Sequence, residues 1–337
     1  MITVTLYTRK NCQLCDQAKE DLASLQSEIS HRLVEVFVDE NPDLFREFGD
    51  RVPVVEAGPY RKYAPFNRQE LAVTLGAARD RQNSLERIGS PQYQNQVRRG
   101  QMIDSGDKIS WWISRNYLWV LNLVLFLYVG LPFLAPVLMK AGYEKPAKAI
   151  YLVYSPFCHE LGFRSWFLFG EEPYYPRAAA GVQGVPTFKE ATGIDENNLL
   201  AARNFVGNEK LGYKVALCER DVALYLGILI FSLLFAFTGR NLKPLPFWAW
   251  VLFGIVPIAL DGFSQLFSQM NIPGFNMLVP YRESTPLLRT LTGFLFGFMT
   301  GWFGIPYVEE SMRESRAQLV KKFAVVNVKN QRETTKQ

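Results

Sequence analysis

Four long runs without a charged residue constrain this chain of 337 residues more than any other feature. They cover residues 116–139, 222–239, 244–260 and 290–307. A helix needs about 20 predominantly apolar residues to cross a bilayer. The first run is therefore long enough alone, and the other three should extend into polar residues at their ends. We expect an α-helical transmembrane bundle of about four spans, embedded in the lipid bilayer.

Four glycines recur along the last of these runs, at Gly293, Gly297, Gly301 and Gly304. They share one side of a helix, and small residues at this spacing let two helices approach closely. We interpret them as packing residues of the bundle.

The basic residues predict an orientation in the membrane. The segment before the first run holds seven of them, the loop at 240–243 holds two without an acid, and the tail after the last run holds seven. Basic residues in short loops stay on the cytosolic side. We therefore predict a multi-pass inner-membrane protein with cytoplasmic N- and C-termini and an outer loop at 140–217. Residues 1–11 carry no apolar segment typical of a signal peptide, which agrees with a cytosolic N-terminus.

The net charge of +5 is explained by this orientation, and no stripe of basic residues interleaved with aromatics suggests a nucleic-acid groove. We expect no nucleic-acid partner. Four cysteines are too few for a disulfide scaffold at this length. Their individual positions therefore matter more than their number.

The first 80 residues are charge-rich and follow an α/β pattern. Alternating and β-branched residues predict strands, and spacing of three to four predicts helices. The expected order is strand, helix, strand, short helix, two strands and helix, over 2–7, 14–28, 34–38, 42–48, 52–55, a short strand after residue 59, and 67–78. Cys12 and Cys15 stand at the tip of the first helix, where amide dipoles stabilise a thiolate.

Two segments carry a resemblance to a known family: Tyr7-Thr8-Arg9-Lys10-Asn11-Cys12-Gln13-Leu14-Cys15-Asp16 and Arg51-Val52-Pro53-Val54-Val55. With this order of elements, residues 1–80 resemble the glutaredoxin-like branch of the thioredoxin superfamily. The resemblance implies that Cys12 is the nucleophile, that Cys15 resolves its mixed disulfide, and that Pro53 is cis and lies beside them. It implies glutathione or a cytosolic thiol protein as partner.

Gln13-Leu14 stand where familiar glutaredoxins carry Pro-Tyr. The alternative to redox activity is a fold kept as a docking module. Residues 81–115 are interpreted as a polar basic linker, and residues 311–337 as a charged cytosolic tail.

Several unusual residues fall on the predicted outer side of the bundle. Ionisable residues at membrane depth are costly, so they usually form pairs or serve a function. We expect Asp261 to pair with Arg289 or Arg282, with substrate binding as the alternative. The candidate residues are Cys158, His159, Arg164, Cys218, Asp221, Asp261, Gln265, Arg282 and Arg289.

These motifs, with Cys158-His159, Cys218-Glu219-Arg220-Asp221 and Tyr281-Arg282-Glu283-Ser284-Thr285 in this order, resemble a prokaryotic family of multi-spanning membrane proteins of unknown function. In that family the second motif is Cys-x-x-Cys, so the resemblance implies a zinc or iron set. Here Asp221 takes the last position, which leaves Cys158, His159, Cys218 and Asp221 as candidate ligands. A structural disulfide between Cys158 and Cys218, or two unpaired thiols, are the alternatives.

Three functions remain open from the sequence. The first is a membrane-anchored thiol–disulfide redox protein. The second is a metal-binding membrane protein whose outer site is regulated by the redox domain. The third is a non-enzymatic assembly subunit with a membrane partner.

Overall fold

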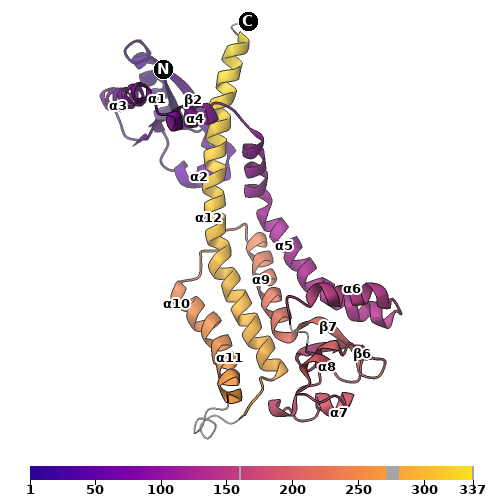
Figure 1. Ribbon diagram of the computed structural model, residues 1–337. Helices are drawn as coiled ribbons and strands as arrows, with labels where there is room; N and C mark the ends of the chain where they lie inside the picture. The colour runs from indigo at the N-terminus through magenta and orange to yellow at the C-terminus, as the bar shows by residue number, and fades with distance from the viewer. Residues whose placement is uncertain (159–160, 271–280, 336–337) are drawn as a thin grey trace. The chain divides into compact units, whose positions relative to one another are not determined.

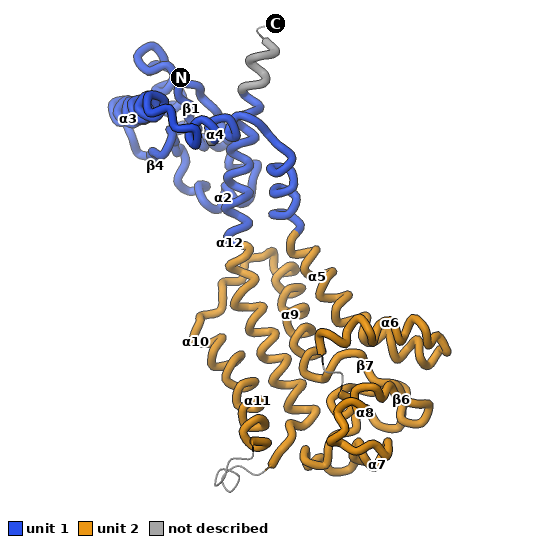
Figure 2. The backbone as a smooth tube through the Cα atoms, in the orientation of Figure 1, with its two compact units in different colours: residues 1–116, 310–337 blue, residues 117–309 orange. Residues whose placement is uncertain are grey.

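A computed structural model describes residues 1–158, 161–270 and 281–335 of the chain (Figure 1). The chain forms two compact units, which are coloured separately in Figure 2. Unit 1 comprises residues 1–116 and 310–337, and unit 2 comprises residues 117–309. Both boundaries fall inside long helices, α5 (Ser105–Lys140) and α12 (Pro286–Thr335).

Unit 1 is built on a four-stranded sheet of order β2-β1-β3-β4. β1 pairs with β2 in parallel and with β3 antiparallel, and β3 pairs antiparallel with β4. The predicted order of elements is confirmed, as is the α/β class of this domain. The elements are β1 (Ile2–Thr8), α1 (Gln13–Ser24), η1 (Leu25–Ser27), β2 (His31–Phe37), η2 (Val38–Glu40), α2 (Pro42–Phe48), β3 (Val54–Ala57), β4 (Tyr60–Tyr63) and α3 (Arg68–Ile88).

Alternation along β1 divides the hydrophobic residues between the two faces of the sheet. Ile2, Val4 and Leu6 join one core with Leu22 of α1 and Leu71 of α3. This core fixes α1 against the sheet, and so fixes the position of the residues at its first turn.

The other face of the sheet carries a second core, to which Tyr7 contributes from β1 and Phe48 from α2. The distal part of α12 packs on this core through Ala317, Val320 and Val325. The segment for which the sequence predicts a charged tail is therefore a helix, and its apolar residues cover a face of the sheet.

The segment 81–115, for which the sequence predicts a polar linker, is also helical over most of its length. α3 continues to Ile88 and ends at Gly89, whose positive φ of 64° suits a residue without a Cβ. α4 (Pro91–Gly100) follows, and α5 begins at Ser105.

Unit 2 contains α9, α11 and the parts of α5 and α12 that lie within residues 117–309, together with a small three-stranded sheet of order β5-β7-β6. Between α5 and α9 the chain forms α6 (Glu144–Tyr154), η3 (Gly162–Arg164), β5 (Ser165–Leu168), η4 (Ala178–Ala180), α7 (Phe188–Thr192), α8 (Leu199–Asn204), β6 (Gly207–Asn208) and β7 (Gly212–Cys218). The remaining helices are α9 (Glu219–Phe237), α10 (Phe247–Trp250), η5 (Val251–Ile255), α11 (Val256–Gln269) and α12.

Among the described residues, four stretches of helix are long and apolar enough to cross a membrane: Ser105–Lys140, Glu219–Phe237, Phe247–Gln269 and Pro286–Val328. Each contains most or all of one predicted uncharged run, which confirms a helical part with four candidate spans.

Two of the four glycines of α12 for which a packing role was predicted lie against the backbone of α9. A Cβ on Gly297 would lie 1.9 Å from the carbonyl oxygen of Leu224, and one on Gly293 would lie 2.6 Å from that of Arg220. α9 and α12 therefore meet backbone to backbone at these two positions. A Cβ on Gly304 would meet nothing within 4 Å, so this last glycine has no packing role of this kind.

Candidate functional site

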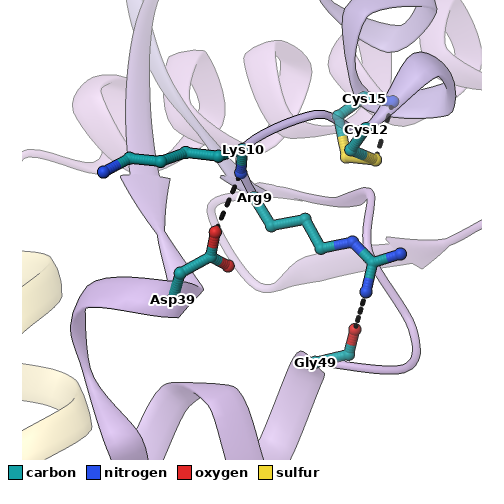
Figure 3. The surroundings of a disulfide bond; sticks show 6 residues. All are labelled: Arg9, Lys10, Cys12, Cys15, Asp39 and Gly49. Atoms are coloured by element: carbon teal, nitrogen blue, oxygen red, sulfur yellow. Dashed lines mark hydrogen bonds between the residues drawn. A yellow bond between two sulfur atoms is a disulfide. The ribbon is translucent and has the colours of Figure 1, made fainter.

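Cys12 and Cys15 lie at the start of α1 and form a disulfide (Figure 3). Asn11 has a positive φ of 57°, and Cys12 has an extended backbone, so the chain turns sharply from β1 into the helix. Both cysteines are nearly buried, with exposed fractions of 8% for Cys12 and 2% for Cys15, whereas Leu14 between them is 60% exposed. The CxxC loop therefore presents an apolar side chain to solvent above a shielded sulfur pair.

Cys12 occupies the capping position of α1. Its carbonyl accepts hydrogen bonds from the amides of Cys15 and Asp16, and its Sγ accepts one from the Cys15 amide at 3.2 Å. An amide directed at sulfur at a helix N-terminus stabilises a negative charge there. This arrangement favours Cys12 over Cys15 as the thiolate of the reduced pair.

The neighbouring cations Arg9 and Lys10 have oxygen atoms as partners. The Lys10 side chain extends away from the disulfide (Figure 3). Its Nζ lies 3.7 Å from Glu40. The Arg9 guanidinium donates to the carbonyl of Gly49 at 3.5 Å. The Cys15 amide at the helix terminus is the donor that the structure places at Cys12 Sγ.

Pro53 precedes β3, and the Val52–Pro53 peptide bond is cis, as the resemblance implied. The carbonyl of Pro53 accepts a hydrogen bond from the amide of Ala64 at 3.2 Å. This bond ties the start of β3 to the segment that follows β4.

Three of the four predicted metal ligands come together in unit 2. One ligand atom from each of Cys158, Cys218 and Asp221 lies within 4.8 Å of the other two. His159, the fourth predicted ligand, lies outside the described residues. Cys158 lies in the segment that follows α6, Cys218 ends β7, and Asp221 lies in the first turn of α9, so this segment meets the junction of β7 and α9.

Among the described residues, neither cysteine of this cluster forms a disulfide, so both are thiols. A hydrogen bond with Cys158, together with burial, raises the pKa of the Cys218 thiol well above its ordinary value. Cys218 is consequently a poor nucleophile near neutral pH, and a bound cation would favour its thiolate form.

Their spacing agrees with a tetrahedral zinc or iron site. Zn–S bonds of about 2.3 Å and Zn–O bonds of about 2.0 Å place neighbouring ligand atoms roughly 3.5–3.8 Å apart. Two thiols and a carboxylate within 4.8 Å reach that spacing after small side-chain movements. The donor set therefore fits a metal, with a further position left for another ligand.

Asp261 is the centre of a buried ion-pair network beside this region. Its carboxylate accepts hydrogen bonds from Arg220, from Arg282 at 2.9 Å and from the Ser284 hydroxyl at 2.7 Å. The predicted pair with Arg282 is present, and Arg220 is a second partner that the sequence did not identify. Gln265 supports the same group by accepting from the Ser284 amide at 3.3 Å.

Glu283 is a second buried acid, and arginines surround it. It pairs with Arg164 at 2.6 Å, with Arg177 at 3.4 Å and with Arg289. Arg289 also contacts Glu219 at 3.3 Å, so the predicted alternative partner of Asp261 belongs to this network instead.

Glu219 and Glu283 lie within the sequence motifs but are not among the predicted site residues. The sequence could have identified both as candidates, because each is an acid next to an arginine near the end of an apolar run.

Comparison with protein families agrees with this two-part organisation. Residues 3–76 match the family described as glutaredoxin-like domain (DUF836). Residues 201–303 match the family described as predicted membrane protein (DUF2085). The chain therefore carries a glutaredoxin-like domain followed by a predicted membrane protein domain, as the two resemblances implied.

Individual relatives cover parts of the chain. The uncharacterized protein MJ1492 of Methanocaldococcus jannaschii is 24% identical over 201 residues, which are 58% of this chain and 93% of that protein. The uncharacterized proteins Mb0520 of Mycobacterium bovis and Rv0508 of Mycobacterium tuberculosis are each 44% identical over 57 residues. That match covers 15% of this chain and 59% of the length of each mycobacterial protein. No solved structure matches the chain significantly.

Proposed function

We propose that this protein is a membrane-anchored thiol–disulfide oxidoreductase in which Cys12 is the nucleophile and Cys15 the resolving thiol. The observation that carries the proposal is the position of Cys12 Sγ at the start of α1, 3.2 Å from the Cys15 amide. Its partner is a cytosolic thiol protein or glutathione. We place the protein in the inner membrane with both termini in the cytosol, on the distribution of basic residues.

The chemistry is two successive thiol–disulfide exchanges. The Cys12 thiolate attacks one sulfur of a partner disulfide, a mixed disulfide forms, and the other partner sulfur leaves as a thiolate. Cys15 then attacks Cys12 Sγ, the mixed disulfide breaks, and the second partner thiol is released. The partner gains two electrons and the Cys12–Cys15 pair loses them. The reverse sequence oxidises a partner dithiol.

A trapping experiment tests this order of attack. In Cys15→Ser, Cys12 can form the mixed disulfide but nothing resolves it, so a covalent partner adduct should accumulate in membranes and disappear on reduction. Cys12→Ser is the matched control and should trap little or nothing. Equal trapping by both variants would remove the assigned roles, and stronger trapping by Cys12→Ser would reverse them. Absence of adducts, together with a Cys12–Cys15 pair in the wild type that cannot be reduced, would favour a docking module.

A second candidate function is metal binding in unit 2. Its supporting observation is that ligand atoms of Cys158, Cys218 and Asp221 lie within 4.8 Å of one another. These residues would hold zinc or iron, and a bound ion would act as a Lewis acid or as a structural clamp. The thiols would bind as thiolates, and Asp221 would supply the oxygen ligand.

Elemental analysis of purified full-length protein separates the two functions. A stoichiometric metal that is retained in Cys12→Ser but lost in Cys218→Ser and Asp221→Asn would establish the second function beside the first. Absence of metal in the wild type would reject it. If the Cys12–Cys15 pair also fails to cycle, the remaining function is that of an assembly subunit with a membrane partner.

A further inference from the structure

One side of α6 is buried against the rest of unit 2. Ala147, Tyr151 and Tyr154 recur at helical spacing and are buried. The Tyr151 hydroxyl donates to the carbonyl of Lys214 in β7. The Tyr154 hydroxyl donates to the carbonyl of Tyr128 in α5 at 3.0 Å. α6 is therefore fixed both to a candidate span and to the small sheet, so its opposite, outward side has a defined direction.

The outward side of α6 is apolar at its C-terminal end. Leu152 is 74% exposed and Val153 is 62% exposed, and Phe157, in the segment that follows, is 66% exposed. Single exposed apolar residues are normal on a protein surface, but a cluster of large ones marks a surface that contacts another apolar phase or molecule. This end of α6 is therefore a candidate contact surface.

The same side of the helix is charged at its N-terminal end. Lys145 precedes Leu152 by about two helical turns, so both side chains lie on one side of the helix. Lys148 and Glu144 form an exposed ion pair at 2.7 Å in this half of α6. The outward side thus changes from charged to apolar along the helix axis. A phospholipid leaflet has the same gradient from headgroups to acyl chains, whereas a protein interface has an apolar centre with a polar rim.

α6 is also continuous with a candidate span. Near the end of α5, Leu134 and Val137 are still exposed. The chain then turns at Gly142, which has a positive φ of 82°, and α6 leaves the end of α5 in a new direction (Figure 1). A helix that turns away at the end of a span starts at the edge of the hydrocarbon layer. The bilayer around α5 is therefore the apolar phase nearest to the outward side of α6.

We propose that α6 is an interfacial helix that binds the phospholipid bilayer. Leu152, Val153 and Phe157 insert among the upper parts of the acyl chains. The N-terminal half stays among the headgroups, where Lys145 and Lys148 extend toward phosphate groups. This contact depends neither on the Cys12–Cys15 pair nor on a metal in unit 2.

Fluorescence quenching on the full-length protein in phospholipid nanodiscs tests this position. The environment-sensitive dye NBD is attached to Leu152→Cys, and to Val153→Cys as a second reporter should the first variant fail to fold. The quenchers are iodide in the water, and phospholipids that carry a nitroxide near the headgroup end or near the methyl end of an acyl chain. The apolar side of an interfacial helix lies about 5–10 Å into the boundary between headgroups and chains. We therefore expect strong quenching by the shallow nitroxide, and several-fold weaker quenching by the deep one and by iodide.

Two further variants provide references. Lys145→Cys lies on the same side of α6 and should be quenched by both iodide and the shallow nitroxide. Lys210→Cys lies between β6 and β7, where the native side chain is 72% exposed, and should be quenched by iodide alone. Wild-type protein treated in the same way corrects for label on the native cysteines. Iodide quenching at Leu152→Cys and Val153→Cys as strong as at Lys210→Cys would overturn the proposal, because the outward side would then face water. Protection from iodide and from both nitroxides would also overturn it, because a protein partner or a second copy of the chain would then cover that side.

Discussion

Arg316 of α12 donates from Nε to Oδ2 of Asp43 across 2.6 Å, although 273 residues separate them in the sequence. A second nitrogen of the same guanidinium donates to the carbonyl oxygen of Ser114. Asp43 lies in the first turn of α2, which the second core of unit 1 holds against the sheet. The end of the chain is thereby part of the same folded unit as the glutaredoxin-like domain.

Arg316→Ala should destabilise unit 1 by about 2–3 kcal/mol, because it leaves a partly buried carboxylate without its main partner. Arg313→Ala is the matched control, since Arg313 lies 3.9 Å from the same carboxylate and is more exposed. It should cost less than about 1 kcal/mol. Hydrogen exchange of the amides in Pro42–Phe48 measures both effects in the full-length protein. Equal protection in the two variants would contradict a structural role for the Arg316 pair.

Gly297→Ala should separate α9 from α12, because its Cβ would lie 1.9 Å from the carbonyl oxygen of Leu224. We expect a loss of about 1–3 kcal/mol, the usual range for overpacking. Gly304→Ala should be neutral or slightly stabilising, since its Cβ has open space and alanine favours a helix by about 1 kcal/mol. Thermal unfolding in detergent checks the pair of variants. A Gly297→Ala protein as stable as the wild type would show that the helices are packed less closely.

Asp261→Ala should be among the most damaging substitutions in unit 2, because it leaves the Arg220 and Arg282 guanidinium groups without their shared acid. Removing one member of a buried ion pair costs about 3–5 kcal/mol. Gln265→Ala removes a single hydrogen bond from the same network and should cost about 1 kcal/mol. The folded fraction recovered from membranes, followed by size-exclusion chromatography, compares the two. Similar yields would indicate that the arginines find other partners.

The thiol of Cys218 should resist alkylation in metal-free protein, because its hydrogen bond with Cys158 and its burial raise its pKa. At pH 8 its thiolate fraction is then lower than that of an ordinary cysteine, and its rate should still rise as the pH increases further. Cys158→Ala removes the largest cause and should speed alkylation of Cys218 at pH 8. Mass spectrometry of the peptide that contains Cys218 gives the rates, with denatured protein as reference. An unchanged rate in Cys158→Ala would show that burial alone protects the thiol.

The sequence alone predicted the features that depend on local pattern. Alternation in residues 2–7 and helical spacing after Cys12 led to the order of elements in the glutaredoxin-like domain. Runs without charge led to the four candidate spans. A lipid environment requires an unbroken apolar run, and a strand or helix with two different faces requires a regular spacing of apolar residues. Both patterns involve neighbouring residues only, so they can be recognised without knowing distant contacts.

Tertiary structure decided which distant residues meet. From the sequence we expected Asp261 to pair with Arg289 or Arg282, but Arg289 forms ion pairs with Glu219 and Glu283. It also predicted a charged tail where α12 covers a face of the sheet. The sequence around an arginine or an acid does not specify its ion-pair partner, because the partner depends on how separate helices pack. The periodicity of a segment specifies its own conformation and which of its faces is apolar, whereas its neighbour is determined by the packing of the whole unit.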